Sequence, residues 1–443
     1  MNQSFFIKTY GCQMNEYDSE KLNELLKFNG YKLSKNFENS DIAILNTCNI
    51  REKASEKLYS DLGRLSKFKE NKAKIGKKMH IIVTGCVAQA QGEEILKRNK
   101  NVDYIFGPQN FHQLPSILKK SSSDKVFNDF LCEEKFSSLS PSSSKDVSKL
   151  VTIQEGCDKF CSFCVVPYTR GAEFSRLVED IYAEVNTLVN NGAKEITLLG
   201  QNVSSYESNI YKNGQDIKIK LSGLCKSLSR ISGLERIRYL TSHPLDIDEA
   251  LIKEHKNNNK LMPFLHLPIQ SGSDDILKKM NRKHTKKFYL DLISQIKKQN
   301  ENMAFSSDFI VGFPGETDRD FQETIDLIEK VGFASSYSFK YSSRPGTPSS
   351  TINKNIDEEV MNVRLRHIQG KLNKQQKDFN LSFLDKNVNV LFTGKGNKTN
   401  QFVGRTPYLQ PVHVFSENNL TGKLLKVKIL ELTSFSFHGK LCE

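Results

Sequence analysis

Three cysteines lie close together in the stretch QEGCDKFCSFCVVPYTRG, residues 154–171. They are Cys157, Cys161 and Cys164, and their spacing is C-x3-C-x2-C. Thiolates bind zinc or iron–sulfur clusters, and a closed structural site of either kind needs four protein ligands. The nearest histidine after Cys164 is His243, which is too far along the chain to complete a local zinc finger. The triplet therefore predicts a metal centre that keeps one coordination position open.

Three further cysteines each stand at the end of an apolar segment near the N-terminus. The segments SFFIKTYGC, DIAILNTC and HIIVTGC end at Cys12, Cys48 and Cys86, which are 36 and 38 residues apart, about one strand–helix unit. Right-handed crossovers bring the C-terminal ends of parallel strands to one edge, where ligands bind. We therefore expect the three cysteines to meet in space, although a single strand-end cysteine is most often a small buried apolar residue. Glycines beside Cys12 and Cys86 would allow tight turns.

Residues 150–350 alternate between apolar strands and helical patterns. The predicted strands are LVTIQEG, EITLLGQNV, RIRYLTSHP, PFLHLPIQSG, MAFSSDFIVGF and SYSFKYSS. Six strand–helix units predict an α/β fold with a partial parallel barrel, since a complete barrel has about eight. The cysteine triplet follows the first strand, so it would lie at the C-terminal mouth of the barrel, where active sites are found.

The rest of the chain differs in composition. The serine-rich residues 121–148 predict a linker, in which Cys132 is expected to be an isolated thiol. A lysine-rich helix over residues 361–380 precedes the strands NVNVLFTG, FVGRTPYLQPVHVF and LLKVKILELTSFSFHGKL, which predict a small all-β barrel. The predicted domains are an N-terminal α/β domain (residues 1–120), the linker (121–148), the partial barrel with its following helix (149–380) and the small β-barrel (381–443).

Positive charge is concentrated at the C-terminal end. The chain has 64 Lys and Arg against 51 Asp and Glu, a net charge of +13, and residues 361–443 hold 13 Lys and Arg and 5 Asp and Glu, a net +8. A basic small β-barrel is a common RNA-binding form, whereas a solvated lysine surface is the alternative. No apolar stretch reaches membrane-spanning length and the start lacks a signal-peptide pattern. These features predict a cytoplasmic protein without membrane contact, whose cysteines are reduced.

The triplet and its place after the first barrel strand resemble the radical S-adenosylmethionine superfamily. There, such a triplet holds a four-iron cluster whose open iron binds S-adenosylmethionine and cleaves it reductively to a 5′-deoxyadenosyl radical. The resemblance implies that Phe163 lies near the adenine. It also implies that Gln201 and Asn202, near the end of LLGQNV, contact the methionine part of S-adenosylmethionine. The alternative is that both are ordinary polar loop residues. The segment DFIVGFPGE, residues 308–316, resembles the one that runs along the adenosine.

The motifs YGCQMNEYDSE, LNTCNIREKA and TGCVAQ resemble the methylthiotransferase family within that superfamily. This resemblance implies that Cys12, Cys48 and Cys86 hold a second, auxiliary four-iron cluster that presents sulfur. It also implies that the C-terminal barrel is a TRAM-like RNA-binding domain. The stretches GCQMN, NTCNIRE and MPFLHLPIQSGSDDILKKMNRKHT look most like the members that act on isopentenylated tRNA. Members that act on a ribosomal protein usually read GCPKN, and those that act on threonylcarbamoyladenosine usually read GCKVN.

The resemblance thus implies a tRNA methylthiotransferase that inserts a methylthio group at C2 of N6-isopentenyladenosine, just 3′ of the anticodon. Its cofactors would be two 4Fe–4S clusters and S-adenosylmethionine, and its partners the tRNA anticodon stem-loop and an external electron donor. The C2–H bond is unactivated, so acid–base chemistry cannot replace it and radical chemistry is required. The alternatives are a methylthiotransferase for threonylcarbamoyladenosine or a ribosomal protein, and a non-catalytic iron–sulfur RNA-binding sensor, which would not cleave S-adenosylmethionine.

Overall fold

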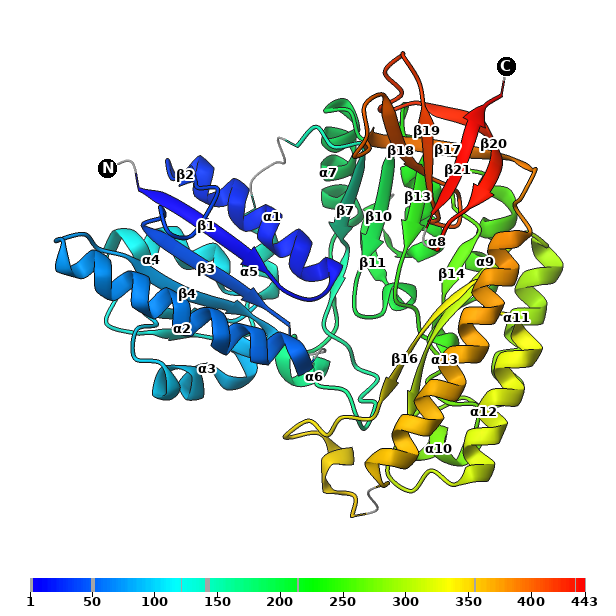
Figure 1. Ribbon diagram of the computed structural model, residues 1–443, viewed down its shortest axis with the longest axis horizontal. Helices are drawn as coiled ribbons and strands as arrows, with labels where there is room; N and C mark the ends of the chain where they lie inside the picture. Colours follow the sequence, from blue (N-terminus) through cyan, green and yellow to red (C-terminus); the bar gives the residue numbers. More distant parts are fainter. Residues whose placement is uncertain are drawn as a thin grey trace. The chain divides into compact units, whose positions relative to one another are not determined.

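The computed structural model describes residues 3–48, 52–120, 122–139, 144–212, 215–353, 356–434 and 436–442. Contacts within the chain divide it into two compact units, which are treated separately below (Figure 1). The first unit comprises Met1–Ser143 together with Gln154–Asp158 and Val165–Arg176, and the second comprises Ser144–Ile153, Lys159–Cys164 and Leu177–Glu443. Among the helices of the described ranges, none combines the length and the apolar character needed to cross a membrane.

A parallel sheet of six strands forms the centre of the first unit, in the order β2–β1–β3–β4–β5–β6. The strands are β1 (Ser4–Thr9), β2 (Lys32–Leu33), β3 (Ile42–Thr47), β4 (His80–Gly85), β5 (Tyr104–Phe106) and β6 (Val126–Phe127). Strand β3 is buried along its whole length, as expected for a parallel strand covered on both faces.

Helices cover both faces of this sheet. Helices α1 (Gln13–Phe28) and α4 (Leu114–Lys120) contribute side chains such as Leu22 to the core on one face. Helices α2 (Glu52–Lys74) and α3 (Cys86–Arg98) contribute side chains such as Leu62 and Ile95 to the core on the other. The predicted N-terminal parallel α/β fold is therefore confirmed.

Much of the serine-rich segment is folded into the first unit rather than forming a plain linker. Strand β6 extends the sheet, where the Phe127 ring stacks on Phe106 at 5.0 Å between centroids. The short helix α5 (Cys132–Ser137) buries the side chain of Lys135 completely. The serine content concealed this structure because the few apolar residues that anchor the segment do not form a periodic pattern. Residues 121 and 140–143 of the predicted linker lie outside the described residues.

Six parallel strands form an open barrel in the second unit (Figure 1). Two three-stranded sheets, β7–β10–β13 and β14–β15–β16, are joined by a parallel bridge between Ile237 and Leu261. The strands are β7 (Ser148–Thr152), β10 (Glu195–Leu199), β13 (Arg236–Tyr239), β14 (Phe264–His266), β15 (Ala304–Val311) and β16 (Ser335–Lys340). The predicted partial (βα)6 barrel is confirmed.

Alternate strand residues of the barrel, such as Ile196, Ile237 and Phe309, belong to the same buried core as side chains of the flanking helices. These helices are α7 (Val178–Asn190), α8 (Leu221–Leu228), α9 (Glu249–Asn257), α11 (Lys286–Gln299) and α12 (Asp318–Val331). Gly332 has a positive φ of 66° and caps α12, as a C-terminal glycine should. An antiparallel hairpin of β11 (Glu207–Lys212) and β12 (Gln215–Lys220), which the sequence pattern did not reveal, precedes α8.

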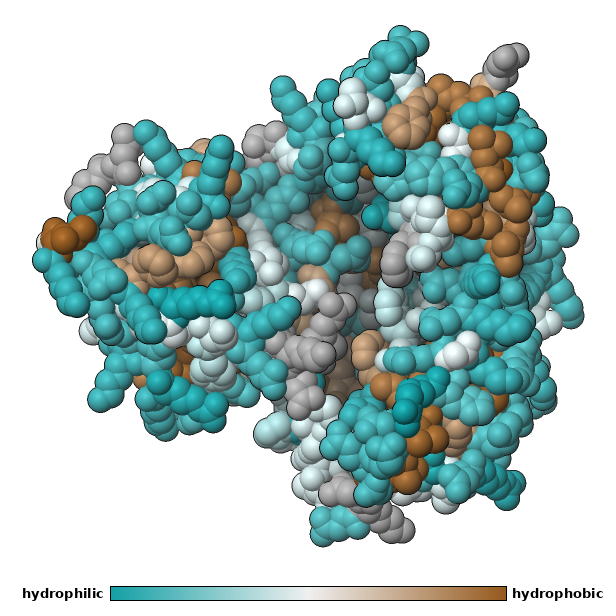
Figure 2. All heavy atoms as spheres, viewed as in Figure 1, coloured by the Kyte–Doolittle hydropathy of each residue, from teal (hydrophilic) through white to brown (hydrophobic). Residues whose placement is uncertain are grey.

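The long helix α13 (Glu358–Leu381) leads into a closed five-stranded barrel, which confirms the predicted small all-β domain. Its strands are β17 (Asn387–Lys395), β18 (Gln401–Arg405), β19 (Pro411–Phe415), β20 (Leu424–Leu432) and β21 (Phe437–Leu441). Figure 2 shows hydrophobic side chains over this part of the surface among mostly hydrophilic ones, and Phe415 and Leu430 are 56% and 48% exposed.

Two buried arginines of β13 attach this small barrel to the larger one. Arg236 donates to the carbonyl oxygens of Arg405 at 2.8 Å and Asn389 at 2.9 Å. Arg238 donates to the carbonyl oxygens of Pro407 at 2.6 Å and Thr406 at 2.9 Å, while its Nε bonds Glu195 at 2.8 Å. Because these guanidinium groups are almost fully buried, the carbonyl acceptors are required to keep them satisfied.

Candidate functional site

Cys12, Cys48 and Cys86 lie at the C-terminal ends of three adjacent strands. Cys12 is the residue before α1, Cys48 directly follows β3, and Cys86 directly follows β4 as the first residue of α3. The Cys12 and Cys48 thiols form a hydrogen bond, and Cys86 interacts electrostatically with Cys12. The structure thus brings together the three cysteines whose meeting the strand pattern predicted.

Two glycines allow the strand ends to approach closely. Gly11 has a φ of 107°, and a Cβ atom placed there would lie 2.1 Å from the Cβ of Cys48. Gly85 has a φ of 94°, and its Cβ atom would lie 2.3 Å from the carbonyl oxygen of Thr47. At both positions the backbone has a positive φ and there is no room for a Cβ atom, so only glycine fits. The tight turns expected beside Cys12 and Cys86 are therefore present.

Buried polar side chains brace these turns against one another. Asn15 donates through Nδ2 to the carbonyl oxygens of Tyr10 and Thr47, both at 2.9 Å. Asn46 donates in turn to the carbonyl oxygen of Asn15 at 2.9 Å, and the Thr47 hydroxyl donates to that of Thr84 at 2.6 Å. These bonds link the ends of β1, β3 and β4 and so explain the asparagines and threonine in GCQMN and NTC.

The thiols have an electrostatic environment that favours metal binding. The hydrogen bond with Cys48 and the charge of Arg170 outweigh burial and lower the pKa of Cys12 to about 6. Burial raises the pKa of Cys86, and the Arg170 charge acts against this increase. Metal binding requires the thiolate, so a positive charge beside the thiols supports it.

Four charged side chains are buried beside the thiols in the first unit. Arg170 Nη2 lies 2.9 Å from Asp18 Oδ2, and Arg170 Nη1 lies 3.2 Å from Glu155 Oε1. Lys135 Nζ lies 2.8 Å from Asp18 Oδ1 and also forms an ion pair with Glu155. Their side chains are no more than 3% exposed. The group therefore holds two positive and two negative charges, and each acid contacts both bases.

The donor set suits an iron–sulfur cluster better than a single ion. Within the described ranges, no three His, Cys, Asp or Glu side chains are arranged so that they could hold one metal ion. A four-iron cluster makes a different demand, because each thiolate binds a different iron and the sulfurs need not converge on one point. Three thiols, one of them ionised near neutral pH, fit such a cluster.

The loop that carries Cys161 and Cys164 is fixed by backbone and side-chain bonds in the second unit. The amide of Cys164 donates to the Cys161 carbonyl oxygen at 2.9 Å. The Ser162 amide donates to the carbonyl oxygen of Met280, just after helix α10 (Asp274–Lys279), at 3.0 Å. The Ser162 hydroxyl donates to the carbonyl oxygen of Lys279, the last residue of that helix, at 2.8 Å. In the first unit, the Cys157 amide donates to the carbonyl oxygen of Gly171 at 3.2 Å.

A buried arginine also accompanies this second group of thiols. Arg282 Nη1 donates to Cys161 Sγ at 3.6 Å, and its Nη2 donates to the carbonyl oxygen of Pro268. Thus Arg282 contacts Cys161 of the triplet, and the charge of Arg170 acts on Cys12 and Cys86 at the strand ends.

The three predicted contacts to S-adenosylmethionine have different surroundings. Phe163 is partly buried and packs against the apolar cluster of Ile276, Met280 and Phe313. Gln201 follows β10 and is partly exposed. The Asn202 amide is engaged within the protein: its Nδ2 donates to Asp246 at 2.7 Å, and its Oδ1 accepts from the amide of His243 at 2.9 Å.

Sequence reasoning missed the buried partners of the thiols. Asp18 lies three residues after Asn15 on the inward face of α1, a polar pair at helical spacing that could have signalled a buried site. Glu155 and Arg170 flank the cysteine triplet, but nothing in the local pattern shows that they are buried. Lys135 gave no signal, because it lies in the serine-rich segment.

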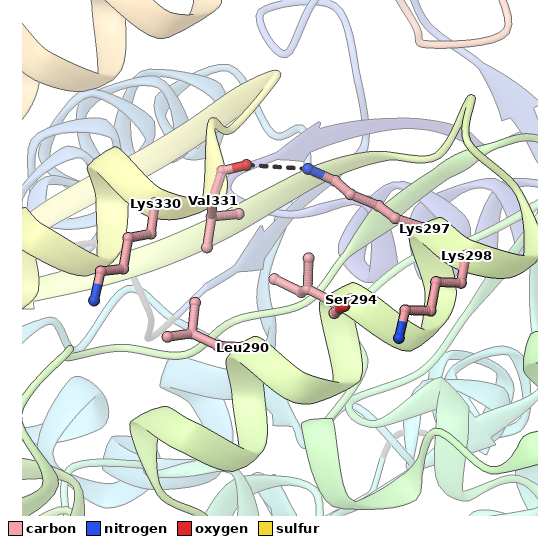
Figure 3. A pocket seen from close by; sticks show the side chains of 7 residues that line it. Leu290, Ser294, Lys297, Lys298, Lys330 and Val331 are labelled. Atoms are coloured by element: carbon pink, nitrogen blue, oxygen red, sulfur yellow. Dashed lines mark hydrogen bonds between the residues drawn. The ribbon is translucent and has the colours of Figure 1, made fainter.

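A separate depression of about 380 Å3 lies on the outer side of the larger barrel (Figure 3). Lys297 and Lys298 of α11 and Lys330 of α12 line it, and Lys297 Nζ donates to the carbonyl oxygen of Val331 at 3.2 Å. None of the predicted site residues lines it, so it does not belong to either thiol group.

Two family models match separate parts of the chain. Residues 4–107 match the model of Uncharacterized protein family UPF0004, and residues 151–328 match the Radical SAM superfamily. The chain is 48% identical to the tRNA-2-methylthio-N(6)-dimethylallyladenosine synthase of Rickettsia rickettsii (strain Sheila Smith), over 100% of both chains. It is equally similar to the protein of that name from Orientia tsutsugamushi (strain Boryong), over 100% of this chain and 99% of the relative.

A solved structure supports the fold alone. The radical S-adenosylmethionine methyltransferase TsrM from Kitasatospora setae aligns with a TM-score of 0.58 and 11% identity, over 79% of this chain and 75% of that one. Full-length identity of 48% carries more weight. The chain therefore belongs to the radical S-adenosylmethionine methylthiotransferase family, in the branch of the tRNA-2-methylthio-N(6)-dimethylallyladenosine synthases.

Proposed function

We propose that this protein inserts a methylthio group at C2 of N6-isopentenyladenosine in tRNA, at the base just 3′ of the anticodon. The observation that carries the proposal is the gathering of Cys12, Cys48 and Cys86 at one sheet edge, with a buried guanidinium beside them. A chain that only generated radicals would need a single thiol triplet. A second group of three thiols can hold a second cluster with one iron left open, and in the family to which this chain belongs that is the site proposed to present sulfur.

The strand-end cysteines would hold an auxiliary 4Fe–4S cluster, and Cys157, Cys161 and Cys164 would hold the one that binds S-adenosylmethionine. When bound, these cofactors supply one-electron chemistry at an unactivated carbon and the sulfur and methyl group that are transferred. The chain itself positions them. Gly11 and Gly85 let the strand ends approach, and Asn15 and Asn46 hold the turns in place.

Residues of the larger barrel would orient S-adenosylmethionine. Phe163 offers an aromatic face beside an apolar cluster, which suits an adenine ring. Gln201 is partly exposed after β10 and can bond polar groups of the methionine part. Asn202 would act mainly by holding His243 and Asp246 in place, since both ends of its amide are already bonded to them.

The anticodon stem-loop is the proposed partner of the C-terminal barrel. Lys395, Lys398, Lys423 and Lys426 are exposed on this barrel and can contact phosphate groups, which position an RNA without reading its sequence. The target base lies in a single-stranded loop and can be splayed out for recognition. An external electron donor completes the proposed partners, and residues 1–120, 149–380 and 381–443 remain the proposed domains.

The test is an anaerobic assay of the reconstituted full chain with isopentenylated tRNA, read by mass spectrometry of the nucleosides. The expected product is 2-methylthio-N6-isopentenyladenosine, and tRNA without the isopentenyl group serves as the control. Methylthio transfer to threonylcarbamoyladenosine or to a ribosomal protein instead would show that the substrate assignment is wrong. Absence of both transfer and 5′-deoxyadenosine would favour a non-catalytic sensor.

A further inference from the structure

We propose that Arg170 is a positioning residue for the strand-end cysteines, held in place by Asp18 and Glu155 so that its guanidinium faces sulfur and stabilises the reduced cluster. This inference rests on the proposed function, because it takes Cys12, Cys48 and Cys86 as cluster ligands. It assigns a task to a buried ionic group that cluster ligation alone does not explain.

The contacts of Arg170 fix its guanidinium from one side. Nη2 donates to Asp18 Oδ2 at 2.9 Å and to Asn15 Oδ1 at 3.3 Å. Nη1 lies 3.2 Å from Glu155 Oε1 but has no hydrogen bond of good geometry among the described residues. Donor capacity therefore remains on a side chain that is only 2% exposed. Asn15 Oδ1 also accepts from Cys12 Sγ at 3.9 Å, so the guanidinium and this thiol share one acceptor. The charge of Arg170 acts to lower the pKa of both Cys12 and Cys86.

Lys135 prevents the two carboxylates from neutralising Arg170 fully. Asp18 and Glu155 each contact Lys135 as well as Arg170, so neither acid is devoted to the guanidinium. The four groups are balanced in total charge and can therefore stay buried before any cluster is inserted. The charges are nevertheless unevenly placed around the thiols, because Arg170 is the member of the group whose charge acts on both Cys12 and Cys86. The site is thus prepared for negative charge on sulfur.

This arrangement has a direct electrochemical consequence. Hydrogen bonds to sulfur and nearby charge are among the factors that set the reduction potential of an iron–sulfur cluster. A cluster gains negative charge on reduction, so a fixed positive charge beside its thiolates favours the reduced form. Arg170 should therefore raise the potential of the strand-end cluster, and replacing the Asp18 carboxylate should raise it further by leaving the guanidinium less compensated.

The test isolates the strand-end cluster in the full chain by replacing Cys157, Cys161 and Cys164 with Ala. In this background, iron content and the midpoint potential of the remaining cluster are measured by an electrochemical titration followed by electron paramagnetic resonance. For Arg170→Gln we expect a lower iron content, because the positive charge beside the thiols supports metal binding. In the protein that retains the cluster we expect reduction to be about tenfold less favourable, which for a one-electron couple is a shift of about 59 mV to more negative potential. For Asp18→Asn we expect a shift of opposite sign.

Arg282 provides the matched control. In the unaltered chain it bonds Cys161, a thiol of the other group that is already replaced in this background, so Arg282→Gln should leave the potential of the strand-end cluster at its starting value. Arg170→Lys, which keeps the charge, should restore most of the decrease in potential seen with Arg170→Gln. Unchanged potentials in Arg170→Gln and Asp18→Asn would overturn the inference, and if the Gln variant does not fold, Asp18→Asn decides alone. Absence of iron in the parent background would instead overturn the proposed function and this inference with it.

Discussion

A Cβ atom at Gly11 would lie 2.1 Å from the Cβ of Cys48, a distance at which two carbon atoms cannot coexist without a shift of the backbone. Gly11→Ala should therefore displace the Cys48 turn and lower the iron content by about half, one cluster of two. Gly30→Ala is the control, since Gly30 also has a positive φ, of 88°, but no other atom lies within 4 Å of the position that its methyl group would take. It should cost only about 1–2 kcal/mol of stability. Equal iron content in the two variants would contradict the proposed role of this close approach.

Replacement of a strand-end cysteine should separate radical generation from sulfur transfer. Cys12→Ala, Cys48→Ala or Cys86→Ala should lose about half the iron, yet still cleave S-adenosylmethionine to 5′-deoxyadenosine, because each cluster has its own thiolates. No methylthio group should reach tRNA. Iron analysis and parallel quantification of 5′-deoxyadenosine and the modified nucleoside check this. A triple Ala variant that still modifies tRNA would disprove the two-cluster assignment.

The loop cysteines should give the complementary result. Cys157→Ala, Cys161→Ala or Cys164→Ala should also retain about half the iron, but reductive cleavage of S-adenosylmethionine should be abolished, since two thiolates do not hold the cluster in its three-ligand geometry. The measurement is anaerobic turnover with a chemical reductant and detection of 5′-deoxyadenosine. Cleavage at the native rate in any one of these variants would show that the triplet has been misassigned.

The buried charge group should dominate the stability of the first unit. Lys135→Met leaves Asp18 and Glu155 with Arg170 alone, so one buried negative charge is uncompensated, and we expect a loss of about 3–5 kcal/mol. Lys371→Met removes an exposed pair with Glu329 and should cost less than about 1 kcal/mol. Urea unfolding followed by a probe in each unit measures both. Similar losses would mean that the ion pairs of Lys135 contribute no more than an exposed pair.

Positive charge on the small barrel should govern the salt dependence of tRNA binding. Replacing the exposed Lys395, Lys398, Lys423 and Lys426 with Gln should weaken binding and lower the salt slope by about one for each phosphate group that the variant no longer neutralises. Four exposed lysines of the first unit serve as the control for net charge: Lys67, Lys74, Lys77 and Lys78. A slope that falls equally in both variants would show that the barrel has no special role.

Deletion of residues 382–443 would be a poorer test of the same idea. Arg236 and Arg238 donate to backbone carbonyls of this domain and are almost fully buried. Removing the domain would take away these acceptors and expose the buried surface around both arginines to water, so the truncated chain would be destabilised irrespective of RNA binding. Surface substitutions avoid this problem.

Regular patterns made the fold and the strand-end thiols predictable. The cysteines at 12, 48 and 86 share one local position after apolar strands, and parallel topology alone brings such positions together. The six barrel strands and α13 were likewise visible as apolar runs and helical spacing. These features repeat along the sequence, so local reasoning suffices to find them.

The buried partners of the thiols could not be predicted, because nothing local identifies them. Lys135 and Arg170 are separated by 117 and 152 residues from the Asp18 that they share. Charged residues of this kind are usually exposed, and only the folded chain shows that four of them neutralise each other in the interior. The hairpin of β11 and β12 was missed for a different reason, since its strands carry many polar residues.

The joint between the two barrels of the second unit places little constraint on sequence. Arg236 and Arg238 bond to main-chain oxygen atoms of Asn389, Arg405, Thr406 and Pro407, and every amino acid offers such an oxygen. These bonds therefore tolerate a change of side chain at the acceptor positions. Tyr408 is different, because its hydroxyl donates to the carbonyl oxygen of Asn302 at 3.0 Å and so adds a side-chain contact to the attachment. The contribution of Arg236 and Arg238 thus depends on the backbone shape of the small barrel, and exposed residues elsewhere on that barrel can change while these bonds persist.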